Sequence, residues 1–365
     1  MKSSRTIGIC AAFAVIMMWA AAARATTIRV HYDTGFGNKI SIRGSASPLS
    51  WTAGKDATWT TGNIWTYTWA NTAGDLDVKP LINDSAWSTG GNYHLKSGVT
   101  ADVYPFFGAS AGTFAQINNF ASPQLGNSRT LILYLPPSYN ENTAKHYPVL
   151  YMHDGQNLFN AATSAFGVEW QVDENINSLV GNGQMDEVIV VGIYNNANRI
   201  WEYTPCCDPT YGGGGADTYS QFVINTVKPY IDQHYRTLPS AANTAIMGSS
   251  LGGLLSFYMA RNNPTVFSKA GGLSSSFWWN NDALPATVEQ STTHVPVRFY
   301  IDAGTDNDGL ADTTRMDSAL LADGYVQGKD LDYYVAQGGS HNETSWAARV
   351  AIPLTWLFPW QSTAY

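Results

Sequence analysis

The sequence predicts an α/β domain with a mainly parallel central sheet, preceded by a small all-β sandwich. Two observations carry this prediction: short strand-like runs fill the first part of the chain, and strand-like runs alternate with helical periods in the second part. The 365 residues, 44% of them apolar and 13% charged, suit a folded protein with a small domain and a mid-sized one.

Residues 1–25 have the pattern of a signal peptide. Lys2 and Arg5 give a basic start, residues 7–18 are almost all apolar, and Ala23-Arg24-Ala25 matches the small-x-small cleavage pattern. The apolar run is short for a bilayer span, so a retained anchor is the less favoured alternative. We expect a secreted or periplasmic protein with no membrane association after signal cleavage.

The formal net charge is −8, and it becomes −11 when the signal peptide leaves with its three cations. A strongly acidic chain disfavours nucleic acid and anionic membranes as partners, because both require clustered cations. The charge suits a neutral polymer or a small ester.

The cysteines and histidines do not form a metal-type spacing, so we expect no metal. Cys10 lies in the signal peptide, and Cys206 and Cys207 are adjacent. A vicinal disulfide, two free thiols and pairing with another chain all remain open.

Residues 26–107 are predicted to form the β-sandwich, because short runs rich in β-branched and aromatic residues are separated by Gly, Asn, Asp and Ser clusters. The strand-like runs are residues 28–32, 40–42, 64–69 and 76–81. Five tryptophans fall in this part of the chain: Trp51, Trp59, Trp65, Trp69 and Trp87.

A linker is predicted over residues 108–127, which begin with the passage Gly108-Ala-Ser-Ala-Gly112. Residues 128–365 are predicted as the α/β domain. Its expected strands are 148–152, 188–194, 244–247, 297–301 and 331–335, and its expected helices are 219–235, 251–261, 314–322 and 345–357. This alternation is typical of a parallel sheet covered on both faces.

The candidate nucleophile is Ser250, in Gly248-Ser249-Ser250-Leu251-Gly252. An apolar strand leads directly into this motif and an apolar helix follows it. A serine at such a turn is exposed at the end of the sheet, and flanking glycines remove steric conflict. The neighbouring Ser249 is less favoured by the register of the motif.

His341 is the candidate base, because it lies in a glycine-rich loop after the last predicted strand. The acid should follow the strand 297–301, where Asp302, Asp306 and Asp308 are available. Asp302 is expected to belong to the strand itself. We favour Asp308, with Asp306 as the runner-up, and the order serine, acid, histidine agrees with Ser-His-Asp hydrolases of the sheet-helix type.

Two backbone N–H groups should stabilise the oxyanion. Leu251 follows the nucleophile and is expected to supply one of them. The second should come from the loop after the strand 148–152, where we favour Gly155 or Gln156. Asp154 is expected to hold this loop in place.

From about residue 128 to 360 the chain resembles the putative-esterase family of α/β-hydrolases, which includes feruloyl and acetyl-xylan esterases, esterase D and enterochelin esterases. The resemblance lies in residues 129–139, 147–159, 247–253 and 338–346. It implies an α/β-hydrolase sandwich and ester hydrolysis without a cofactor. Arg199 and Glu202 match a family segment near the pocket, and a structural Arg–Glu pair is favoured over substrate contact.

The smaller part resembles starch-binding carbohydrate-binding modules, through residues 44–51, 64–69, 78–79 and 87–92. The resemblance implies that Trp51 and Trp87 stack on sugar rings, that Lys79 bonds to sugar hydroxyls and that Trp65 is in the core. The alternative is that these tryptophans belong to the core and the module is only a spacer.

These observations predict a secreted serine carboxylic-ester hydrolase with a Ser-His-Asp triad and an acyl-enzyme intermediate, acting on feruloyl or acetyl esters of a polysaccharide. One alternative is an esterase for siderophores or other small esters, or an acyltransferase, with the same triad. The other is a carbohydrate-binding protein with an inert hydrolase domain.

Overall fold

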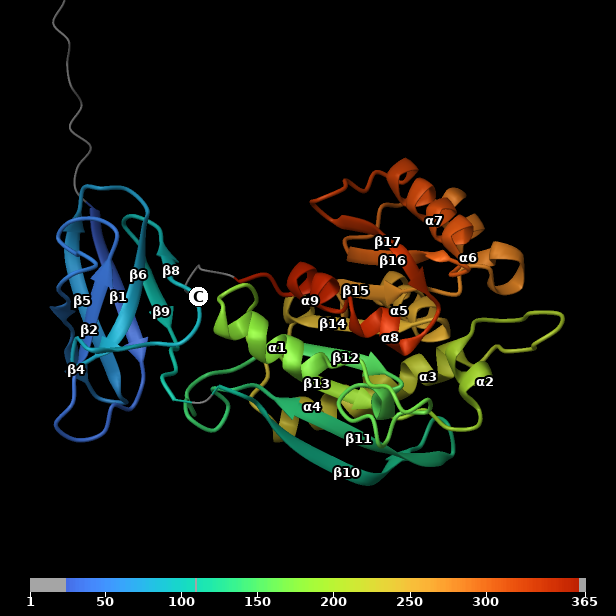
Figure 1. The fold of residues 1–365 in the computed structure, drawn as a ribbon, viewed down its shortest axis with the longest axis horizontal. Coiled ribbons are helices and arrows are strands. Elements are labelled where there is room, and N and C mark those ends of the chain that lie inside the picture. Colours follow the sequence, from blue (N-terminus) through green and yellow to red (C-terminus); the bar gives the residue numbers. More distant parts are fainter. Residues whose placement is uncertain (1–23, 109, 361–365) are drawn as a thin grey trace, which may run out of the picture.

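The computed structural model describes residues 24–108 and 110–360 (Figure 1). Nearly all of the predicted signal peptide therefore lies outside the described residues. The described chain contains two small sheets, one eight-stranded sheet and the helices around the latter. No helix within the described ranges is long and apolar enough to cross a membrane.

The first part of the chain is an all-β sandwich, as the sequence predicts. One sheet has the order β4-β5-β1-β9 and the other β3-β2-β6-β7, with β8 also paired to β6. The strands are β1 (Arg24–His31), β2 (Ile40–Gly44), β3 (Lys55–Asp56), β4 (Thr58–Thr60), β5 (Ile64–Asn71), β6 (Leu76–Ile82), β7 (Ala86–Trp87), β8 (Tyr93–Leu95) and β9 (Thr100–Val103). Alternate residues such as Ile28, Val30, Ile40 and Ile42 point into a common core.

The second part is built on an eight-stranded sheet in the order β10-β11-β13-β12-β14-β15-β16-β17. The strands are β10 (Thr113–Ser122), β11 (Asn127–Leu135), β12 (Val149–His153), β13 (Ile189–Ile193), β14 (Thr244–Ser249), β15 (Lys269–Leu273), β16 (Arg298–Asp306) and β17 (Leu331–Ser340). The pairs β10–β11 and β11–β13 are antiparallel. All other neighbours in this order, from β13 through β12 and β14 to β17, are parallel.

The predicted linker 108–127 is wrong over half of its length, because residues 113–122 form β10 and pair with β11. β10 is an edge strand with mostly exposed side chains. The polar composition of this strand explains why the sequence predicts a linker there.

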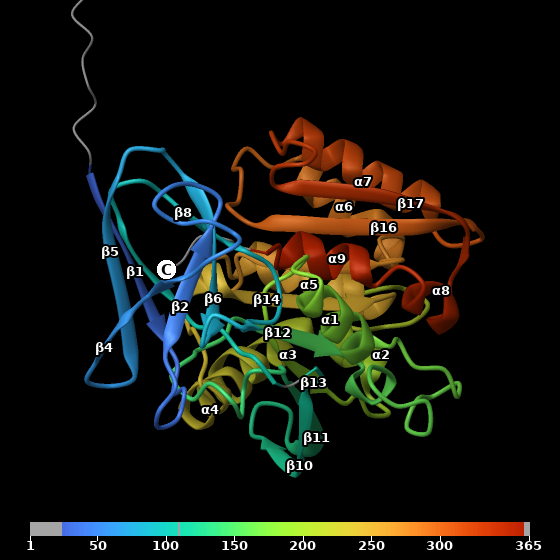
Figure 2. The same cartoon turned by 60° about the vertical axis from the view of Figure 1, so that its left-hand side comes forward.

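Helices cover both faces of the large sheet (Figure 2). They are α1 (Val172–Gly181), α2 (Arg199–Tyr203), α3 (Ala216–Phe222), α4 (Lys228–His234), α5 (Leu251–Asn262), α6 (Trp279–Glu289), α7 (Leu310–Ala322), α8 (Glu343–Ala347) and α9 (Ala351–Leu357). Buried side chains of α1, α8 and α9 share one core, and those of α2 to α7 share the other.

Two predicted helices are interrupted. A π-helical turn, Val223–Val227, separates α3 from α4 within the predicted helix 219–235. The predicted helix 345–357 is split into α8 and α9, with Pro353 in the first turn of α9. Proline lacks an N–H and is tolerated mainly in a first turn, which explains why a helix restarts there.

The sandwich packs against the side of the α/β domain where the parallel strands begin (Figure 1). Asn142, in the segment before β12, donates to the carbonyls of His31 (2.9 Å) and Pro105 (2.8 Å). The Tyr32 hydroxyl donates to Glu141 at 2.8 Å, and the Trp360 ring N–H donates to the Asn92 carbonyl at 2.9 Å. The carboxyl ends of the parallel strands therefore lie on the side remote from the sandwich.

Candidate active site

Ser250 occupies the turn between β14 and α5. Its φ of 54° and ψ of −125° are strained for a residue with a side chain. The turn is tight: a Cβ at Gly248 would lie 2.7 Å from the Gly252 carbonyl carbon, so glycine is required there. The local sequence thus presents the Ser250 hydroxyl at the carboxyl end of the sheet.

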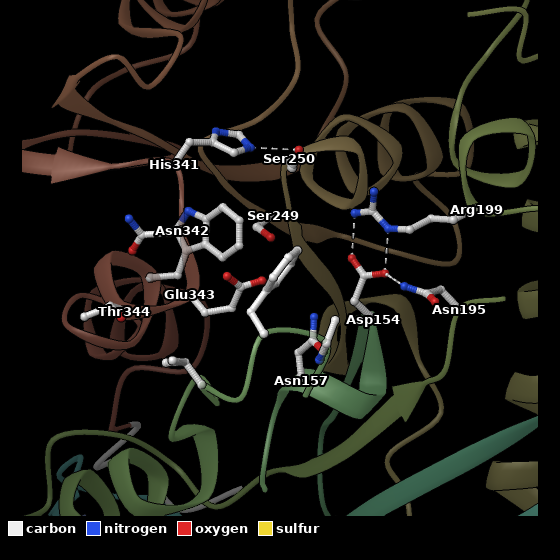
Figure 3. Close-up of a pocket in the computed structure, with 14 residues that line it drawn as sticks. Asp154, Asn157, Asn195, Arg199, Ser249, Ser250, His341, Asn342, Glu343 and Thr344 are labelled. Atoms are coloured by element: carbon white, nitrogen blue, oxygen red, sulfur yellow. Dashed lines mark hydrogen bonds and ion pairs between the residues drawn. The ribbon is translucent and has the colours of Figure 1, made fainter. Parts of the chain in front are cut away.

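His341 lies immediately after β17 and reaches Ser250 across ninety-one positions of sequence. Its Nε2 is 2.9 Å from Ser250 Oγ (Figure 3). Its Nδ1 is 2.7 Å from Asp308 Oδ1. An ionised carboxylate can only accept a hydrogen bond, so His341 Nδ1 carries a proton and donates it to Asp308. In the neutral imidazole Nε2 is then unprotonated and can accept the serine proton. The structure brings Ser250, His341 and Asp308 together.

Asp308 is buried in a network of donors that the sequence did not reveal. Its Oδ2 accepts hydrogen bonds from the Gly304 N–H and the Ser274 hydroxyl, both at 2.6 Å. Burial alone would raise the pKa of Asp308, but the hydrogen bonds from His341, Ser274 and Gly304 outweigh it and hold the pKa below its ordinary value. The carboxylate is therefore kept ionised.

Ser274 is in turn held by two further side chains. Its Oγ accepts from the Trp346 ring N–H and from Arg349 Nη2, each at 2.8 Å. Arg349 also forms a buried ion pair with Asp302 at 2.9 Å. Asp302 belongs to β16, as expected, and it positions Arg349, which donates to Ser274.

The runner-up acid Asp306 does not contact His341. It is the last residue of β16 and is exposed, and its Oδ2 accepts from the Ser340 hydroxyl at 2.9 Å. The rejected base His153 is buried and lies between Tyr203 and Tyr219, and burial lowers its pKa to about 3. Asp306 is therefore not placed to act as the triad acid, and His153 is not placed to act as the base for Ser250.

A pocket of about 600 Å³ opens beside Ser250. It is lined by Asp154, Asn157, Ala165, Phe166, Val168, Asn195, Arg199, Ser249, Ser250, His341, Asn342, Glu343, Thr344 and Trp346. From the loop after β12 the lining includes Asp154 and Asn157 but neither Gly155 nor Gln156. Leu251 is not part of the lining either, although it starts α5 directly after Ser250.

The predicted Arg199–Glu202 pair is wrong. Arg199 instead binds Asp154 through Nε and Nη2, both at 2.8 Å, and Asn195 donates to the same carboxylate at 2.6 Å. Burial would raise the pKa of Asp154, but Arg199 outweighs it and lowers that pKa. Asp154 therefore holds its loop in place, as expected.

Glu202 binds a different arginine. Arg129 of β11 meets it in a buried ion pair, with contacts of 3.0 and 2.9 Å. The Arg129 guanidinium also lies over the ring of Phe222, at 5.0 Å from its centroid. This pair ties α2 to β11 of the large sheet.

In the sandwich, Trp51 and Trp87 lie together and are exposed to 38% and 43%. Their ring centroids are 6.3 Å apart, and Arg43 lies over Trp87 at 5.0 Å. Trp65 is in the core, as expected, with 8% exposure. The Lys79 ammonium donates to the Gly90 carbonyl at 2.6 Å.

Cys206 and Cys207, which the sequence left open, are joined by a disulfide in the exposed loop after α2.

The strand-to-helix turn at Ser250, the hydrogen-bonded Ser-His-Asp series and the mainly parallel sheet define an α/β-hydrolase. The chain belongs to the Esterase family, described as "Putative esterase", whose model matches residues 122–355. It is a carboxylic ester hydrolase.

Three curated proteins illustrate the relationship. The chain is 25% identical over 251 residues to the uncharacterized protein YbbA of Bacillus subtilis, covering 65% of this chain and 95% of YbbA. It is 31% identical over 142 residues to the siderophore triacetylfusarinine C esterase of Aspergillus fumigatus, covering 37% and 46%. It is 23% identical over 241 residues to an endo-1,4-beta-xylanase/feruloyl esterase of Xylanibacter ruminicola, covering 64% and 30%.

Two solved structures share the fold. A ferulic acid esterase matches with a TM-score of 0.56 and 20% identity, over 68% of this chain and 98% of its own. The enterobactin esterase of Shigella flexneri matches with a TM-score of 0.53 and 13% identity, over 87% and 88%.

Proposed function

We propose that this protein is a secreted serine esterase in which Ser250 is the nucleophile, His341 the general base and Asp308 the orienting acid. The observation that carries the proposal is the pair of hydrogen bonds at His341, 2.9 Å to Ser250 and 2.7 Å to Asp308. Both lie within the distance range expected for a nucleophile and its base.

In the first half of the reaction, His341 Nε2 takes the Ser250 proton while Oγ attacks the ester carbonyl. The backbone N–H of Leu251 and an N–H of Gly155 or Gln156 stabilise the oxyanion. His341 then returns the proton to the departing alcohol, and an acyl-enzyme remains. Water, activated by the same imidazole, releases the acid and restores Ser250.

The substrate we favour is a feruloyl or acetyl ester on a polysaccharide. Two observations support it: one relative is an endo-1,4-beta-xylanase/feruloyl esterase, and the sandwich exposes the Trp51–Trp87 pair. Exposed tryptophan rings suit the apolar faces of sugar rings. In this proposal the sandwich retains the polysaccharide while the ester is cleaved at the other end of the molecule.

A second candidate substrate is a siderophore ester. It is favoured by the siderophore triacetylfusarinine C esterase among the relatives and by the match to the enterobactin esterase fold. The triad would be the same, so only the acyl and alcohol groups distinguish the two candidates.

A substrate panel on the mature protein tests the proposal. We expect turnover of a simple aryl acetate and preference for a feruloylated oligosaccharide over a cyclic catecholate triester. Ser250→Ala should lower kcat by roughly 10⁶-fold with an unchanged unfolding transition. Substantial turnover by folded Ser250→Ala protein would contradict the assignment of the nucleophile, and the reverse preference would favour the siderophore.

A further inference from the structure

Glu343 is a pocket residue to which the proposed mechanism assigns no role. It begins α8 two residues after His341, and the Asn342 side chain caps this helix by accepting from the Ser345 N–H at 2.9 Å. Glu343 is only 8% exposed, yet its side chain lines the pocket together with Ser249 and Ser250 (Figure 3). The backbone therefore places a largely desolvated carboxyl group in the wall of the pocket that also contains Ser250.

The carboxyl of Glu343 has no partner of its own among residues 24–108 and 110–360 other than its own backbone N–H. The nearest cation of the pocket, Arg199, already makes a two-point contact with Asp154. Burial raises the pKa of Glu343, and it outweighs the opposing effects of its own backbone N–H, His341 and Arg199. A carboxyl group can accept more hydrogen bonds than this one contact, so a ligand in the pocket that supplies a donor is stabilised there.

The surroundings of this acceptor indicate which donor fits. Trp346 lies three positions after Glu343 on the same helix and therefore on the same face. Phe166, Val168 and Trp346 give the pocket apolar walls. An acceptor beside an apolar and aromatic wall suits an aromatic ring that carries a hydroxyl group.

The charge of the pocket favours an uncharged donor. Asp154 and Arg199 neutralise each other, so an ionised Glu343 leaves the lining with a net negative charge. An anionic group would be repelled, whereas a phenol is neutral near pH 7. Either protonation state of Glu343 keeps an oxygen that accepts a hydrogen bond.

We propose that Glu343 determines substrate specificity by accepting a hydrogen bond from the phenolic hydroxyl of an aromatic acyl group. The inference rests on the proposed function, because it assumes that the ester is bound in this pocket next to Ser250. It narrows the substrate class to hydroxyaryl esters. A sugar hydroxyl on the alcohol side is the competing donor.

Binding and turnover of methyl 4-hydroxycinnamate and methyl cinnamate test the proposal, since these esters differ only in the hydroxyl group. Binding is measured in Ser250→Ala protein, so that no turnover is needed. We expect the hydroxylated ester to bind roughly 10- to 100-fold more tightly. Glu343→Leu in the same background should bring the ratio close to one, and Glu343→Gln, which keeps an acceptor oxygen, should leave an intermediate ratio.

The same ratios in kcat/KM are measured with Ser250 intact. Equal binding of the two esters before mutation, or a ratio that survives both Glu343 substitutions, would overturn the proposal. If Glu343→Leu does not fold, Glu343→Gln still decides, because loss of the charge should reduce the ratio several-fold. A Glu343→Leu effect on an acetylated sugar that exceeds the effect on the phenol pair would assign the acceptor to the alcohol side and also overturn it.

Failure of the proposed esterase mechanism and failure of the proposed role of Glu343 give different results in these experiments. Protein that binds the hydroxylated ester in a Glu343-dependent way but hydrolyses no ester would retain the acceptor role and lose the esterase mechanism. Protein that hydrolyses both esters equally would retain the mechanism and lose the specificity residue.

Discussion

Replacing Ser274 by alanine tests whether the network behind Asp308 supports both the fold and the reaction. The hydroxyl donates to Asp308 at 2.6 Å and accepts from Trp346 and Arg349 at 2.8 Å. All four residues are at least 95% buried. Water cannot readily replace the missing hydroxyl in such an environment without rearrangement.

The expected loss can be worked out from these contacts. The Trp346 N–H loses its partner, which costs about 1–3 kcal/mol, and Asp308 loses one of the donors that stabilise its charge. Arg349 keeps its pair with Asp302, and Asp308 keeps its contact with His341. We expect a loss of about 2–4 kcal/mol, a fall in Tm of about 5–12 °C and a kcat lowered about 10-fold. That is far less than removal of a triad acid costs.

The measurements are denaturant unfolding and aryl acetate turnover, with Ser275→Ala as the matched control. Ser275 is also buried, but its Oγ has no hydrogen-bond partner in the described part of the chain. Removing that hydroxyl should cost little or no stability. The network argument fails if Ser274→Ala protein is as stable and as active as Ser275→Ala protein.

The difference in unfolding free energy between Ser274→Ala and Ser275→Ala protein should also depend on pH, and the sign of this dependence follows from the pKa of Asp308. Its folded pKa is lowered, so its ionised form contributes stability above the unfolded pKa, and this stability is lost as the pH falls through the folded pKa. The part of the stability loss in Ser274→Ala protein that comes from Asp308 should therefore decrease below about pH 4. The part caused by the unpaired Trp346 should remain.

Two further predictions concern the other assignments. Asp308→Asn should lower kcat by about 10⁴-fold, because the His341 tautomer is no longer held, while Asp306→Asn should change it less than threefold; the opposite order would make Asp306 the acid. Trp51→Ala and Trp87→Ala should each weaken retention on an insoluble polysaccharide, whereas Trp59→Ala, at a residue that is 53% exposed elsewhere in the sandwich, should not. Equal retention of all three variants would contradict sugar binding by the Trp51–Trp87 pair.

The sequence predicted Ser250 and His341 because their signals are local. The glycines around Ser250 are required by a turn that spans a few residues, and His341 follows directly after a strand that ends at Ser340. The choice between Asp306 and Asp308 depended on where β16 ends. The strand continues to Asp306, and Asn307 takes a left-handed φ of 50° before the chain turns Asp308 inward. Spacing alone does not encode that turn.

Pairings between distant segments were the part that the sequence could not supply. Arg199 and Glu202 are three positions apart, which suggested a local pair, but their partners Asp154 and Arg129 are 45 and 73 positions away. A buried charge takes the partner that the packed elements bring to it, and sequence proximity does not determine which one that is. Ser274 was missed for the same reason, since its partners Asp308, Trp346 and Arg349 lie 34, 72 and 75 positions away.

The segment around α8 explains how catalysis and specificity are linked in this molecule. His341 contacts the nucleophile, Glu343 faces the pocket, and Trp346 and Arg349 turn inward to hold Ser274. Trp346 and Arg349 follow Glu343 at helical intervals, so any displacement of α8 moves the acceptor of the pocket and the support of Asp308 together. Changes to the side chain of Glu343 alone should therefore alter which ester is chosen, whereas changes that shift the helix backbone should lower turnover of every ester.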